Sequence, residues 1–133
     1  MTTSMTTAEA EDSDIKVSLL MVFRHAPYGR SLAREGLEVA LAAGAMGVQL
    51  RVLFINDGVW QLVAGQQADQ LSLKNHLAMT SALPLYGVDE LFVDTASLLE
   101  RSIEPSSLTI PVTLLSEQAV RSLFVKDGHI LSF

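Results

Sequence analysis

No residue of this sequence can carry covalent sulfur chemistry. None of the 133 residues is a cysteine, so there is no thiolate to attack a substrate, to hold a persulfide or to bind an iron–sulfur cluster. The five methionines do not replace cysteine, because a thioether sulfur has no proton to lose. Asp57, Asp69, Asp89 and Asp94 follow no metal-ligand spacing. We therefore expect no metal and no cofactor.

The Arg24-His25 pair is a candidate for phosphate chemistry. It follows an apolar run, as an Arg-His pair follows the first strand of histidine phosphatases. That chemistry needs a second histidine as the acid and further arginines to clamp the phosphate. His76 is expected in a helix, half-buried and hydrogen-bonded, and His129 is expected in a strand, so neither is well placed. We favour a loop at a surface or an interface, formed by Arg24, His25 and the neighbouring Tyr28.

Trp60 is the other residue that stands out, in the stretch DGVWQL. A tryptophan beside the end of a strand can pack over the sheet, or it can anchor a contact with another protein, where tryptophan is over-represented. With no cysteine, no competent histidine pair and no phosphate-binding glycine loop nearby, large apolar side chains have little chemistry to serve. We interpret Val59, Trp60 and Leu62 as candidate anchors of an interface rather than of a substrate site.

Composition and charge limit the class of protein. Hydrophobic residues make up 49% and charged residues 18% of the chain, which excludes a disordered protein. The formal charge of −6 includes four acidic residues before residue 16; without them, eleven acidic and nine basic residues leave −2. Direct binding to nucleic acid needs a basic patch that this balance does not provide.

The apolar runs are too short for the roughly 20 residues of a membrane-spanning helix. The first residues have neither the basic nor the apolar segment of a secretory signal. The expected compartment is therefore the cytoplasm, with no membrane contact.

Residues 1–15 are predicted to be a disordered acidic tail, and residues 16–133 to form one domain. The hydrophobic periods and the turn residues predict strands at 16–23, 49–55, 91–94, 110–115 and 129–133, and helices at about 31–46, 69–83, 95–101 and 117–124. Ser31, Asp69 and Ser116 are expected to cap helices, while Gly47 and Pro84 are expected to end them.

This alternation predicts an α/β fold with three layers: an open, mainly parallel, five-stranded sheet with helices on both faces. Sites in such sheets form outside the carboxyl ends of the strands. The loops at 24–30, 56–66 and 94–97 are therefore expected to meet at one edge and to hold the site.

Five segments in the same order resemble the DsrE/DsrF-like family and, within it, the TusC/DsrF branch. They are APYG (26–29), REGLEVAL (34–41), FINDGVWQL (54–62) with GQ (65–66), LFVDTASLLERSI (91–103) and ILSF (130–133). The resemblance covers residues 16–133, and the third segment is fairly specific. It implies a small α/β domain that assembles with related subunits into a hetero-oligomeric sulfur relay.

The resemblance also implies which role this chain lacks. The active cysteine of the family belongs to the TusD/DsrE-type subunit, and alignment around Leu99 and Arg101 places the equivalent position near Asp94. A carboxylate cannot carry sulfane sulfur, so no catalytic role transfers to this chain. The implied partners are TusB- and TusD-like, or DsrE- and DsrH-like, subunits. A TusA-like sulfur carrier is an indirect partner.

The favoured hypothesis is a non-catalytic, TusC-like subunit of a cytoplasmic sulfurtransferase complex that serves 2-thiolation of the tRNA wobble uridine. Two alternatives remain open. One is a DsrF-like subunit in dissimilatory sulfur oxidation, which the neighbouring genes would distinguish. The other is a free-standing, small-ligand-binding α/β domain that uses the loops at 24–30 and 56–66. An uncharged oligomer interface over those loops would argue against it.

Overall fold

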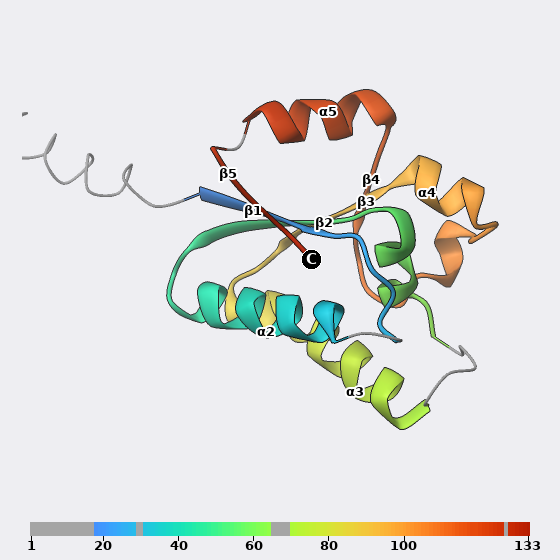
Figure 1. Ribbon diagram of the computed structural model, residues 1–133, viewed down its shortest axis with the longest axis horizontal. Coiled ribbons are helices and arrows are strands. Elements are labelled where there is room, and N and C mark those ends of the chain that lie inside the picture. The colour runs from blue at the N-terminus through green and yellow to red at the C-terminus, as the bar shows by residue number, and fades with distance from the viewer. Residues whose placement is uncertain (1–17, 29–30, 65–69, 127) are drawn as a thin grey trace, which may run out of the picture.

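Five parallel strands form one sheet in the computed structural model (Figure 1). They are β1 (Ser18–Phe23), β2 (Gln49–Phe54), β3 (Glu90–Asp94), β4 (Thr113–Leu115) and β5 (His129–Ser132), in the spatial order β4-β3-β2-β1-β5. Every neighbouring pair is parallel, which confirms the predicted class. The structure describes residues 18–28, 31–64, 70–126 and 128–133; the predicted tail, Asp69 and the GQ segment lie outside these ranges.

Helices cover both faces of the sheet (Figure 1). The α-helices of the described ranges are α2 (Leu32–Ala45), α3 (Gln70–Ser81), α4 (Thr95–Glu100) and α5 (Glu117–Lys126). In the same ranges, three 3₁₀ helices join the elements: η1 (Asn56–Leu62), η2 (Leu83–Tyr86) and η3 (Pro105–Ser107). Helices α2 and α3 lie on one side of the sheet and α5 lies on the other.

The pattern of β1 follows from this double cover. Its last four residues are buried without interruption. Leu20 and Val22 face the apolar cluster beneath α5, whereas Met21 and Phe23 face the larger cluster on the side of α2. A strand that is covered on both faces requires the nearly continuous apolar run that the sequence shows.

Two predicted boundaries need correction because of proline. The strand predicted at 110–115 begins only at Thr113, since Pro111 has no N–H to donate to a ladder. The helix predicted to stop at Pro84 ends earlier, at Ser81, and Pro84 lies within η2. Proline is tolerated there because it stands in the first turn of a new helical segment.

Of the two predicted serine caps, one is confirmed and one is wrong. Ser116 accepts a hydrogen bond from the backbone N–H of Ala119 at 3.2 Å. Ser31 stands at the N-cap position of α2 but makes no side-chain cap bond. Its hydroxyl donates to the Glu35 carboxylate at 2.5 Å instead. Helix α2 ends as predicted before Gly47, whose φ of +85° favours glycine.

Gly58 allows η1 to lie directly against the end of β1. A Cβ at this position would stand 1.8 Å from the carbonyl oxygen of Phe23 and 2.5 Å from its carbonyl carbon. The same oxygen accepts the N–H of Ile55 at 3.0 Å, which holds the end of β2 beside β1. The absence of a side chain at residue 58 therefore sets the distance between the first two loops.

Replacing Gly58 with alanine should lower the free energy of unfolding by about 3 kcal/mol or more, because backbone rather than a flexible side chain must move. Gly128→Ala is the matched control, since a Cβ there meets no atom within 4 Å. Urea denaturation of the two variants measures the difference. A Gly58→Ala protein as stable as the wild type would show that η1 is not held at this contact.

Candidate functional site

The loops after β1, β2 and β3 meet at one edge of the sheet, as predicted. The side-chain amide of Gln61 donates to the carbonyl oxygen of His25 at 2.9 Å, which joins η1 to the loop after β1. The backbone N–H of Asn56 donates to the hydroxyl of Ser97 at 2.8 Å, which joins η1 to α4. Hydrogen bonds of the loops themselves therefore hold this edge together.

Gln61 is the centre of a buried polar network. Its side chain is 1% exposed, and its Oε1 lies 2.8 Å from Nε2 of His76, which is 3% exposed. Since the amide nitrogen of Gln61 donates to His25, its oxygen is the acceptor and the histidine nitrogen donates. Thr80 in turn donates to the backbone oxygen of His76 at 2.8 Å. The prediction of a hydrogen-bonded structural histidine is confirmed, although His76 is buried more deeply than expected.

The charge state of His76 fits this structural role. Burial, together with the smaller effect of the positive charge of Arg34, lowers the pKa of His76 from 6.5 to about 4. The ring is therefore neutral at pH 7. Sequence reasoning missed its partner Gln61, because a glutamine between Trp60 and Leu62 gives no signal that it is buried.

Asp94 caps α4. Its Oδ2 accepts the backbone N–H of Ser97 at 3.1 Å and the Ser97 hydroxyl at 2.6 Å. The carboxylate is almost buried, at 8% exposure. The hydroxyl of Ser97 also accepts the backbone N–H of Asn56. The carboxylate at the end of β3 therefore orders both the helix that follows it and the loop after β2.

An exposed ion pair lies at the same edge of the sheet. Nε of Arg101 lies 3.0 Å from Oδ1 of Asp57, and its Nη1 donates to the carbonyl oxygen of Ser97 at 3.2 Å. The guanidinium thus connects the C-terminal end of α4 with η1.

The residues predicted to anchor an interface differ in how far their side chains are buried. Arg24 and Tyr28 are exposed, and Tyr28 retains 41% of its accessible surface. His25 is half-buried, and its Nδ1 is buried without a hydrogen-bond partner among the described residues. Trp60 is half-buried and packs against the larger core cluster.

The prediction needs correction for Val59 and Leu62. Both side chains are fully buried in the larger core cluster. The turn at Gly58 directs them beneath the sheet edge, where they hold η1 in place, so they are not available to a partner.

Within the described ranges, no three histidine, aspartate or glutamate side chains gather closely enough to hold a metal ion. None of the described helices combines the length and apolar character that crossing a bilayer requires.

A doubly covered parallel sheet, with an ordered polar edge at the carboxyl ends of its strands, defines a small three-layer α/β protein. Residues 17–133 match the model of the DsrE/DsrF-like family. The chain therefore belongs to the DsrE/DsrF-like family.

Its sequence relatives are TusC proteins, so within this family the chain is TusC-like. A TusC homologue of Pseudomonas aeruginosa is 38% identical over 115 residues, covering 86% of this chain and 97% of that protein. The TusC protein of Escherichia coli is 36% identical over 116 residues, covering 86% of this chain and 98% of the relative. The fold is similar to that of the ychN protein of E. coli, with a TM-score of 0.71 at 19% identity, covering 88% of this chain and 99% of that one.

The wild-type protein should lose stability as the pH falls from about 6.5 to about 4. The unfolded chain binds a proton near pH 6.5 at residue 76, whereas the folded chain excludes it until about pH 4. A shift of this size corresponds to a loss of up to about 3 kcal/mol. Urea denaturation across this range should show a shallower loss for His76→Gln. The variant His129→Gln, at an exposed strand position, should behave as the wild type; a His76→Gln protein with an unchanged pH profile would contradict the assignment.

Proposed function

We propose that this protein is a non-catalytic, TusC-like subunit of a cytoplasmic sulfur relay complex that serves 2-thiolation of the tRNA wobble uridine. One observation carries the proposal: identities of 36–38% to TusC proteins over 86% of the chain. The names of these relatives favour the tRNA pathway over the DsrF-like role in sulfur oxidation.

The chemistry of the chain supports an accessory rather than a catalytic role. The sequence offers no cysteine to receive sulfur, and the carboxylate at the end of β3 is engaged in capping α4. Asp94, the position that the family resemblance assigns to the active cysteine of related subunits, therefore has a structural role here. Sulfur in such a complex travels on a cysteine of a TusD-like partner, with a TusB-like subunit completing the assembly and a TusA-like carrier delivering to it.

The carboxyl edge of the sheet supports a docking role for the loops after β1 and β2. Arg24, Tyr28 and Trp60 are of the three residue types that dominate binding energy in protein interfaces. Two of them are exposed, and the network of Gln61 holds both loops rigidly beneath them. A rigid loop loses little conformational entropy when a partner binds, which favours association.

The isolated chain should accept no sulfur. After incubation with a persulfidated carrier protein, intact-mass spectrometry should show no adduct of about 32 Da, the mass of one sulfur atom, because no thiolate is present. In the co-expressed complex the adduct should appear on a cysteine-bearing subunit alone. A reductant-sensitive adduct on this chain would overturn the accessory role.

Tyr28→Ala should weaken binding to the TusB- and TusD-like subunits by about thirtyfold, the effect of losing about 2 kcal/mol at an interface anchor. Tyr86→Ala is the matched control: Tyr86 is 48% exposed, close to the value for Tyr28, but lies in η2, before β3 begins and thus at the opposite edge of the sheet. Titration calorimetry measures both affinities, and thermal midpoints check that each variant folds. If only Tyr86→Ala weakened binding, the docking edge would be the opposite one.

A further inference from the structure

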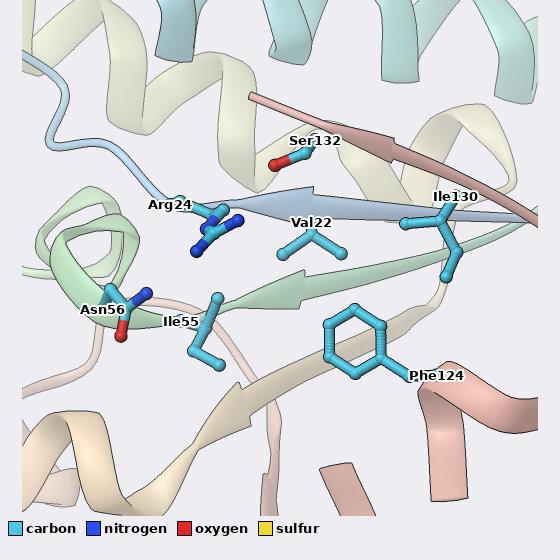
Figure 2. A pocket seen from close by; sticks show the side chains of 7 residues that line it. All are labelled: Val22, Arg24, Ile55, Asn56, Phe124, Ile130 and Ser132. Carbon is cyan, nitrogen blue, oxygen red and sulfur yellow. The ribbon is translucent and has the colours of Figure 1, made fainter. Parts of the chain in front are cut away.

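A cavity of about 190 Å³ opens on the α5 side of the sheet, where β1 and β2 end (Figure 2). Its apolar wall is formed by Val22, Ile55, Phe124 and Ile130. Its polar groups are those of Arg24, Asn56 and Ser132. Neither the polar network of Gln61 nor the cap at Asp94 includes any of these side chains, so the cavity is separate from the hydrogen bonds that hold this edge together.

The apolar wall follows from the register of the sheet. Val22 of β1 pairs with Ser132 of β5, so both lie on the face that α5 covers. Figure 2 shows the ring of Phe124 reaching from α5 toward the strands, opposite Val22, with Ile55 and Ile130 to either side. The hollow lies where the cover that α5 gives the sheet becomes incomplete, and β5 is exposed along its whole length.

The polar groups gather toward the carboxyl ends of the strands. Arg24 follows β1 directly and Asn56 begins η1, and Figure 2 shows both at one end of the cavity. Arg24 makes no ion pair within the described ranges. Asn56 has a φ of +55°, uncommon for a residue other than glycine, and the bond from its N–H to Ser97 holds it there. This fixed backbone carries a side chain that lines the cavity.

These features define the chemistry of a ligand. A guanidinium, an amide and a hydroxyl at one end of an apolar hollow match one anionic group on an apolar body. An apolar cavity of about 150 Å³ is large enough for benzene, so this one accommodates a single ring or a short branched chain with its charged group. Nucleotide-sized ligands need pockets of roughly 300 Å³ or more.

We propose that this cavity is a binding site for a small organic monoanion, such as an aromatic or branched carboxylate, whose charged group pairs with Arg24. The ligand is a free molecule rather than a segment of a partner subunit. The proposal goes beyond the accessory role in sulfur relay and does not depend on it, because the site lies within one chain.

Benzoate is a suitable probe, since it joins one ring to one carboxylate. Titrated into the full-length ¹⁵N-labelled protein, it should bind saturably with a dissociation constant of about 1 mM or tighter. The amide resonances of Asn56 and Ser132 should move with the bound fraction. Benzyl alcohol, which has the same ring without the charge, should bind at least about tenfold more weakly, and inorganic phosphate should not saturate the same resonances.

Arg24→Gln should weaken benzoate binding by at least about tenfold, because the charged partner is lost. Arg121→Gln is the matched control: it removes the same charge from the exposed face of α5, where Arg121 pairs with Glu117 at 3.3 Å. Ile130→Trp should abolish binding by filling the apolar end. The side chains of Arg24 and Ile130 are exposed, so thermal midpoints should confirm that these variants fold.

The outcomes separate this proposal from the proposed function. Saturable binding that Arg24→Gln weakens and Arg121→Gln preserves supports the site, whether or not the chain assembles with partners. Absence of saturation, equal binding by both variants, or resonance changes elsewhere would overturn it. Loss of benzoate binding on addition of partner subunits would assign the cavity to a partner side chain and would also overturn it.

Discussion

The close approach of Gly58 to the carbonyl oxygen of Phe23 is the constraint on which the carboxyl edge of this protein depends. It brings η1 against the end of β1 at a distance that no side chain would allow. From that position η1 sends Val59 and Leu62 into the core and Gln61 beneath the neighbouring loop. The packing of backbone against backbone therefore positions the loops that could form a site, and this positioning does not require their functional side chains.

The polar side chains at this edge form hydrogen bonds that hold its structure, which fits the proposed accessory role. The oxygen of Gln61 accepts a hydrogen bond from neutral His76, and the carboxylate of Asp94 accepts hydrogen bonds from the N–H and the hydroxyl of Ser97. Buried polar groups cost free energy unless they are paired, and pairing them in a network fixes one arrangement of the loops. The result is a rigid edge. Such an edge fits the proposed accessory role, in which a cysteine of another subunit would supply the nucleophile.

The two sides of the sheet differ in how completely helices cover them. The proposed ligand cavity lies on the less covered side. On the side of α2 and α3 the larger core cluster is continuous and includes half-buried Trp60. On the other side, α5 is the helix among the described residues that covers the sheet, and the hollow beside Phe124 remains. Arg24 stands where these regions meet, after the last residue of β1. The same short loop therefore borders both the proposed docking edge and the proposed ligand cavity.

The sequence alone determined the parallel sheet and its helices on both faces, because these depend on hydrophobic period and turn residues, and it showed that the chain has no cysteine. It also indicated that His76 would be structural, from its place on a helix. Only the tertiary structure decided that Val59 and Leu62 are core residues and that Gln61 is buried. Local pattern cannot show these, since each depends on which side chain a distant segment brings opposite. The cavity could not be predicted for the same reason. Its residues come from β1, from the segments that follow β1 and β2, from α5 and from β5, and they meet only when the sheet and its covering helix have assembled.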